Sequence, residues 1–195
     1  MQELLKHIRT FSNMSQTEFA EYLNVSFATV NRWENERAIP NKLAQSKIYD
    51  FCKKNGVPVY DMTLQRIQNA AKAVELEAGR VLLYHGSKSG IEGAIEPKSR
   101  KQCDFGKGFY MGTDPSQALT LICDYEKSKL YLVSIDTRQL AMLDVPADID
   151  WAMLVAYNRG RMERISGTSF YSKYRDMSAS KDLIVGSIAN DRMFY

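Results

Sequence analysis

Two short segments rich in glycine and aromatic residues constrain the second half of this chain more than any other feature. Residues 81–84 (VLLY) form an apolar run with the length of a short buried strand, and His85 follows at the expected strand end. Residues 105–111 (FGKGFYM) predict a second strand, whose glycines let a ligand approach the backbone closely. The spacing of the two segments fits two strands separated by one excursion of the chain.

The two segments together resemble the NAD-dependent ADP-ribosyltransferases of the diphtheria-toxin and poly-ADP-ribose-polymerase type. In that group a His-Gly-Ser/Thr strand end is followed by a glycine-rich Phe-Gly-x-Gly-x-Tyr strand. The chain is most similar to a bacterial family of uncharacterised domains related to that group, which carries Tyr-His-Gly-Ser/Thr, Asp-Phe-Gly-x-Gly-Phe-Tyr and a following Gln-Ala helix. Here these strings are residues 84–87, 104–110 and 117–118, and the similarity covers residues 81–195.

This resemblance implies NAD as the substrate and assigns roles to particular residues. Cleavage of the nicotinamide–ribose bond passes through an oxocarbenium-like ribose, so the site must hold the nicotinamide and orient the ribose hydroxyls. By the resemblance, His85 hydrogen-bonds a ribose hydroxyl, the Gly86 backbone contacts the carboxamide and Tyr110 stacks on the nicotinamide ring. The NAD-binding set is completed by Ser87 and Gly108.

The third catalytic group has two candidates. Related transferases place a glutamate, or a substitute, on a late strand beside the ribose. Asp191 is the first choice because residues 185–191 match the bacterial family, and Asp182 is the second because it precedes the apolar run 183–185. Family members generally continue to a later strand that carries glutamine, whereas this sequence ends at Tyr195. Either an aspartate supplies the third function, or the domain is truncated and inactive.

The first 55 residues predict a small helical module. Four apolar residues have helical spacing: Leu4, Leu5, Ile8 and Phe11. Ser15 and Ser26 are placed to cap two further short helices. A fourth helix is expected after residues 39–41. Four short helices, of which the middle two are joined by a tight turn, are typical of a helix-turn-helix.

Residues 15–34 resemble the Cro and phage-repressor (Xre) class of helix-turn-helix proteins. In that class Ala20 packs where the two helices cross, and a proline follows the second helix, as Pro40 does here. The class usually has glycine where this chain has Glu36, so Asn35 is expected to adopt the left-handed conformation instead. The negative charge of Glu36 is expected to weaken binding to DNA phosphates.

The same resemblance implies a DNA-binding surface. Side chains near the start of the second helix would face the major groove, and the start of the first would anchor phosphate. One module makes few phosphate contacts, so a homodimer is expected. The alternative is a helical protein-interaction module with no DNA role. The implied DNA-binding residues are Gln16, Thr17, Ser26, Phe27, Ala28, Thr29, Asn31 and Arg32.

The chain is therefore expected to be α+β. An all-α helix-turn-helix domain is expected at residues 1–57, followed by a connecting helix at 58–79 that is a rigid spacer or a dimerisation helix. An ADP-ribosyltransferase-like domain with a split antiparallel sheet is expected at residues 80–195. Asn158 and Arg159 are candidates to contact the pyrophosphate of NAD, but a place on the solvated surface is expected for each. In the second domain, strands are predicted at residues 81–84, 108–111, 129–135 and 183–188, helices at 115–126 and 149–159, and irregular structure at 160–180.

Composition limits the remaining possibilities. The net charge is only +3, so DNA contact has to come from local placement of charge. The chain has no apolar run of membrane-spanning length and no secretory signal, and its three cysteines are in no Cys-x-x-Cys arrangement. A cytoplasmic protein with reduced thiols is expected. The chain has two histidines, so no metal centre is expected.

This architecture predicts a DNA-binding protein with an NAD-dependent transferase domain, acting as a toxin or defence component that controls its own expression together with a cognate partner. Two alternatives stay open. In one, the chain is a transcription regulator whose degenerate transferase-like domain senses NAD or ADP-ribose, or mediates oligomerisation. In the other, it is an antitoxin-like protein that binds a toxin.

Overall fold

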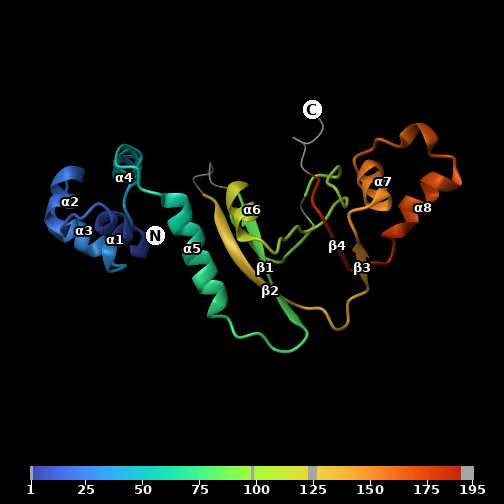
Figure 1. Cartoon of the computed structure of the whole chain (residues 1–195), viewed down its shortest axis with the longest axis horizontal. Coiled ribbons are helices and arrows are strands. Elements are labelled where there is room, and N and C mark those ends of the chain that lie inside the picture. The colour runs from blue at the N-terminus through green and yellow to red at the C-terminus, as the bar shows by residue number, and fades with distance from the viewer. Residues whose placement is uncertain (1, 98, 123–126, 190–195) are drawn as a thin grey trace. The chain divides into compact units, whose positions relative to one another are not determined.

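The computed structural model describes residues 2–97, 99–122 and 127–189 of the chain. These residues fall into two compact units, Met1–Val74 and Glu75–Tyr195 (Figure 1). Each unit buries its own set of apolar side chains, and each is described by itself below. In the described residues, no helix is long and apolar enough to cross a membrane.

The first unit is helical and confirms the predicted helix-turn-helix. Its second and third helices are joined by a three-residue turn through Asn24, which adopts the left-handed conformation with φ of 56°. Ala20 is 2% exposed, as expected for the residue at the helix crossing. The helices are α1 (Gln2–Phe11), α2 (Gln16–Leu23), α3 (Phe27–Glu34), α4 (Lys42–Lys54) and α5 (Val59–Lys72).

Side-chain caps explain why α2 and α3 begin where they do. Ser15 accepts a hydrogen bond from the Glu18 backbone N–H, and the Glu18 carboxylate accepts one from the Ser15 N–H, which makes a capping box. Ser26 caps α3 by accepting a bond from the Thr29 N–H. Beneath these caps, Phe19 and Trp33 are buried in one apolar cluster that also includes residues of α1 and α4, and partly buried residues of α5 pack against it. The predicted cap residues are therefore confirmed.

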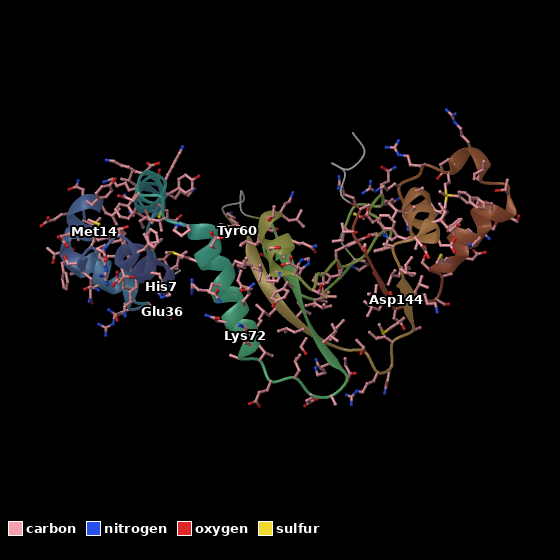
Figure 2. The ribbon with its side chains drawn as sticks, in the orientation of Figure 1. His7, Met14, Glu36, Tyr60, Lys72 and Asp144 are labelled. Carbon is pink, nitrogen blue, oxygen red and sulfur yellow. The ribbon has the colours of Figure 1, made fainter. Side chains whose placement is uncertain are left out.

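The end of α3 differs from the prediction. Asn35 keeps φ at −108°, and Glu36, which is labelled in Figure 2, takes the left-handed conformation with φ of 61°. The reason is the hydrogen-bond pattern: the Arg37 N–H donates to the Arg32 carbonyl at 2.9 Å, and the Glu36 N–H donates to the Trp33 carbonyl at 3.4 Å. This is a Schellman motif, in which the residue after the cap has to be left-handed. Glu36 occupies the position that glycine holds in the Xre class.

The second unit contains helices and two separate pairs of strands, so the α+β class is confirmed. The first pair, β1 with β2, is antiparallel and places His85 opposite Tyr131, whereas the second, β3 with β4, is parallel. Helix α6 contacts β1, and α7 contacts α8 (Figure 1). The elements are β1 (Arg80–Ser87), α6 (Pro115–Thr120), β2 (Lys129–Asp136), β3 (Met142–Val145), α7 (Ile149–Asn158), a 3-10 turn (Glu163–Ile165), α8 (Ser169–Met177) and β4 (Leu183–Gly186).

The predicted strand at residues 105–111 is not formed. Only an isolated bridge joins Gly112 to Tyr84, through two backbone hydrogen bonds of 2.8 and 2.9 Å. Gly106 turns the chain with φ of 79°, and the Tyr110 side chain folds back to bond residues 105 and 106. A segment that closes on itself in this way has no extended backbone to offer to a sheet.

Several other elements of the second unit also differ from the prediction. Strand β3 was not expected because its four residues bury only Val145. Helix α8 and the 3-10 turn lie in the region expected to be irregular, since Tyr174 is the only residue they bury. Helix α6 ends at Thr120, short of the predicted end. Strand β4 likewise ends at Gly186, two residues before its predicted end.

Glu36 provides a test of this backbone geometry. Substituting Glu36→Gly should raise the free energy of unfolding of the first unit by about 1 kcal/mol, because glycine adopts the left-handed conformation without a steric cost. Chemical denaturation followed by helical circular dichroism would measure the change. The control is Glu36→Gln, which removes the charge and keeps the strained backbone. An equal gain in both variants would show that charge, not conformation, is responsible.

Candidate functional site

An ion pair with a buried carboxylate connects three helices of the first unit. Arg9 on α1 donates from Nε to Glu34 Oε1 at 2.7 Å and from Nη2 to Oε2 at 3.0 Å. Gln16, at the first position of α2, donates from Nε2 to Glu34 Oε2 at 2.7 Å. The Glu34 side chain is only 3% exposed. The ion pair therefore joins α1, the start of α2 and the end of α3, and it holds the side chain predicted to anchor phosphate.

The electrostatics of Glu34 follow from the same contacts. Burial acts to raise the pKa of Glu34, but the hydrogen bonds from Arg9 and Gln16 and the positive charge of Arg9 together outweigh it. The pKa of Glu34 is consequently held below its ordinary value, and the carboxylate stays ionised at neutral pH. Arg9 also donates from Nη1 to the Met14 carbonyl at 2.8 Å, which fixes the loop before α2.

The predicted DNA-binding residues lie on α3, its N-cap and the first turn of α2. Phe27, Ala28 and Arg32 are exposed, and Thr29 and Asn31 are half-buried. Asn31 Nδ2 donates to Gln16 Oε1 at 3.4 Å, which links the two helices. The remaining members are Thr17, exposed at the start of α2, and Ser26, the exposed N-cap of α3.

In the second unit, His85 is held by the backbone of residue 110. His85 Nδ1 lies 2.7 Å from the Tyr110 carbonyl oxygen. A carbonyl only accepts hydrogen bonds, so Nδ1 carries a proton, and in the neutral imidazole Nε2 is then the acceptor. Within the described part of the chain, Nε2 has no hydrogen-bond partner. The structure thus brings His85 and Tyr110 together, through a main-chain contact.

The aromatic ring that stacks on His85 is Phe109. The two ring centroids are 4.1 Å apart and the ring planes differ by 23°. The sequence interpretation missed Phe109 because an extended strand would alternate residues 109 and 110 between faces. The Tyr110 hydroxyl instead donates to the Gly106 carbonyl at 2.8 Å and accepts from the Phe105 N–H at 3.0 Å. Burial raises the pKa of Tyr110 to about 12, so the hydroxyl remains a donor that closes its own loop.

The other residues expected to bind NAD make contacts inside the unit. A Cβ on Gly86 would lie 2.5 Å from the Ala118 carbonyl oxygen, so this glycine allows α6 to pack against β1. Ser87 Oγ donates to the Gly90 carbonyl at 2.9 Å. The Gly108 N–H donates to Ser99 Oγ at 2.9 Å. These three positions support the surroundings of His85.

A buried carboxylate connects the closed loop of residues 105–111, called the aromatic loop below, to the segment that follows β4. Asp104 is 7% exposed. Its Oδ1 accepts from Arg159 Nε at 2.9 Å, and its Oδ2 accepts from the Ala189 N–H at 2.8 Å. Asn158 Nδ2 donates to the Asp104 carbonyl at 3.0 Å. The expectation that Asn158 and Arg159 are solvated surface residues is therefore wrong, because the buried charge of Asp104 requires partners.

Of the two candidate aspartates, only Asp182 falls within the described residues. Asp182 is exposed before β4, where its Oδ2 accepts from the Ala141 N–H at 2.9 Å. The carboxyl end of β4 contacts the aromatic loop, since a Cβ on Gly186 would lie 2.7 Å from the Phe105 ring. Asp191 lies outside the described residues, two positions beyond the Ala189 that Asp104 holds.

A separate groove of about 560 Å³ lies between α1 and α5 in the first unit. It is lined on α1 by His7, Thr10 and Phe11 and on α5 by residues that include Asp61 and Arg66. His7 is labelled in Figure 2. In the residues that the structure covers, no group of three or more His, Cys, Asp or Glu side chains is placed to hold a metal ion.

Two family models match the chain. The model described as "Protein of unknown function (DUF3990)" matches residues 81–195. The model described as "Helix-turn-helix" matches residues 5–45, which agrees with the geometry of α1 to α4 and supports a DNA-binding regulator. No curated protein and no solved structure matches the chain.

The Arg9–Glu34 pair predicts a pH dependence of stability. Glu34 has a lowered pKa in the folded state, so its contribution is fully present above the ordinary pKa of a glutamate and is lost as pH falls through the lowered value. Glu34→Gln should lower the free energy of unfolding by about 2–3 kcal/mol at neutral pH, because it leaves Arg9 without a countercharge. The loss relative to the intact chain should shrink at acidic pH.

Denaturation of the full chain over a series of pH values would measure this effect. Glu21→Gln, on the exposed side of α2, is the matched control and should change stability little. A Glu34→Gln loss that stays the same at every pH would contradict the assignment.

The Asp104 contacts predict a large local effect in the second unit. Asp104→Ala leaves the Arg159 charge and the Ala189 N–H without their shared partner, and should destabilise the unit by about 3 kcal/mol. Hydrogen exchange at Ala189 should also become faster. The matched control is Asp144→Ala, an exposed aspartate on β3 that is labelled in Figure 2. Unchanged exchange at Ala189 in the Asp104 variant would contradict the proposed contact.

Proposed function

Because the chain belongs to the family described as "Protein of unknown function (DUF3990)", we propose a function from its own residues. The chain is a DNA-binding protein whose second unit takes NAD as substrate and transfers ADP-ribose to a macromolecule. The helix-turn-helix supports the DNA-binding part. The transferase part rests on the arrangement around His85.

The observation that carries the proposal is the contact between His85 Nδ1 and the Tyr110 carbonyl oxygen. The carbonyl accepts a hydrogen bond from Nδ1–H, so in the neutral imidazole Nε2 presents a lone pair. A ribose hydroxyl is a suitable donor to that lone pair. Phe109 covers one side of the imidazole and limits its rotation, so the acceptor has one direction. A ligand with a hydroxyl beside a flat aromatic group, as in nicotinamide riboside, matches this combination of an oriented acceptor and an apolar ring.

The proposed step is a displacement at the anomeric carbon of the nicotinamide ribose. The bond from C1′ to the nicotinamide nitrogen breaks, and its electron pair leaves with neutral nicotinamide. A lone pair of the acceptor then forms the new bond to C1′, and the acceptor's proton passes to a base or to solvent. His85 orients the ribose, and a carboxylate stabilises the positive charge on it. We assign that carboxylate to Asp191, because the Asp104 contact holds Ala189 at the aromatic loop.

A second candidate function is sensing of NAD or ADP-ribose without chemistry. Two observations favour it: the Tyr110 hydroxyl is already bonded to residues 105 and 106, and the Asp182 carboxylate is already bonded to Ala141. In this case the second unit binds the nucleotide and the first unit responds at DNA. Release of nicotinamide from NAD distinguishes the two, since only transfer produces it.

The biological role proposed for the transferase is that of a toxin or defence component. The helix-turn-helix gives such a protein a direct means to control its own promoter, together with a cognate partner protein. A homodimer is proposed because two modules double the number of phosphate contacts.

The NAD proposal predicts a selective loss on changing His85. His85→Asn keeps a donor to the Tyr110 carbonyl and deletes the Nε2 acceptor, so NAD affinity measured by calorimetry should fall at least about ten-fold. His7→Asn, at the only other histidine of the chain, is the matched control and should bind like the intact chain. No binding by the intact chain, or equal binding by both variants, would overturn the proposal.

A further inference from the structure

The outward face of α3 is unusually apolar for a helix that reads DNA. Phe27, the first residue of α3, leaves 51% of its surface exposed. Ala28 follows it and is also exposed. Neither residue belongs to the apolar cluster of the first unit, in which Val30 and Trp33 represent α3. The start of α3 therefore presents a ring and a methyl group to solvent at the position where helix-turn-helix proteins contact base edges.

The polar side chains near this face are largely occupied by neighbours. Ser26 and Thr29 share a hydrogen bond of 2.8 Å between their hydroxyls. Asn31 Nδ2 donates to Gln16, and Asn35 Nδ2 donates to the Asn31 carbonyl at 2.8 Å. Arg32 Nε donates to the Ala28 carbonyl at 3.3 Å. Direct hydrogen-bond readout by Ser26, Thr29 and the Asn31 amide nitrogen would require existing contacts to be shared or broken.

We propose that Phe27 and Ala28 read thymine through its C5-methyl group in the major groove. This inference rests on the DNA-binding function proposed above and adds the chemical feature that the helix selects. The thymine methyl is the one apolar group that base pairs present in the major groove, and it is contacted by alanine, by phenylalanine and by the methyl group of threonine. An exposed ring at the first position of a recognition helix has this methyl as its natural partner, since both lose apolar surface to water on contact.

Uracil isolates this contact, because it differs from thymine by that methyl group alone and keeps the same pairing edge. Burial of one methyl group corresponds to about a four-fold change in affinity. Two thymines contacted together would multiply the effect. A phosphate or shape contact would be affected little by the replacement, so the ratio of the two affinities reports on the methyl.

The experiment begins with selection of duplexes from a random library by the full-length chain. The dissociation constant is then measured by fluorescence anisotropy for a selected thymine duplex and for the same duplex with deoxyuridine. The intact chain should bind the deoxyuridine duplex about four-fold or more weakly. Phe27→Ala should weaken binding to the thymine duplex and lower the ratio of the two affinities below that of the intact chain, with the contact of Ala28 remaining.

The matched control is Phe11→Ala, which removes an equally exposed phenylalanine, 50% exposed, from α1. It should keep the ratio of the intact chain. Equal affinity of the intact chain for both duplexes, a ratio that survives Phe27→Ala, or selected duplexes without thymine would overturn the inference while leaving DNA binding in place. Failure to enrich any duplex would overturn DNA binding itself, and this inference with it.

Discussion

The carboxylate of Asp104 is the constraint on which the second unit depends. A charge buried in an apolar setting is costly unless partners compensate it, and Asp104 has two: the Arg159 guanidinium and the Ala189 N–H. These partners come from the end of α7 and from the chain after β4. Segments that are distant in sequence are thereby forced to meet at the aromatic loop, because only that meeting satisfies the charge.

The geometry around His85 follows from this loop. Because the Tyr110 hydroxyl bonds residues 105 and 106, the loop closes on itself, and its carbonyl at residue 110 is directed at the imidazole. The orientation of His85 is thus imposed by backbone and not by another titratable side chain. Phe109, carried by the same loop, adds a flat apolar contact. In the neutral imidazole, the acceptor of this site is His85 Nε2, and its direction is set by the contact of Nδ1 with the loop backbone.

The first unit also contains a buried charge whose partners hold separate segments together. Its buried charge, Glu34, is neutralised by Arg9 and bonded by Gln16, and this contact joins three helices. At the start of α3 the Ser26 and Thr29 hydroxyls are hydrogen-bonded to each other, and the exposed apolar side chains there are Phe27 and Ala28. Here local sequence was a good guide: Ser15 and Ser26 cap the helices as predicted, since a cap needs only residues within one turn. Asn35 was a poor guide, because the Schellman hydrogen bonds place the left-handed residue one position later.

The sequence by itself determined the helix-turn-helix, the strand that carries His85, and the α+β class, because caps, apolar periodicity and strand-length runs act over a few residues. Only the tertiary structure decided that residues 105–111 form a closed loop, that Phe109 stacks on His85, and that Arg159 is a partner of the buried Asp104. Those outcomes depend on which distant groups satisfy a buried charge or hydroxyl. Local patterns carry no information about such partners, since the partners are brought together only when the chain has folded.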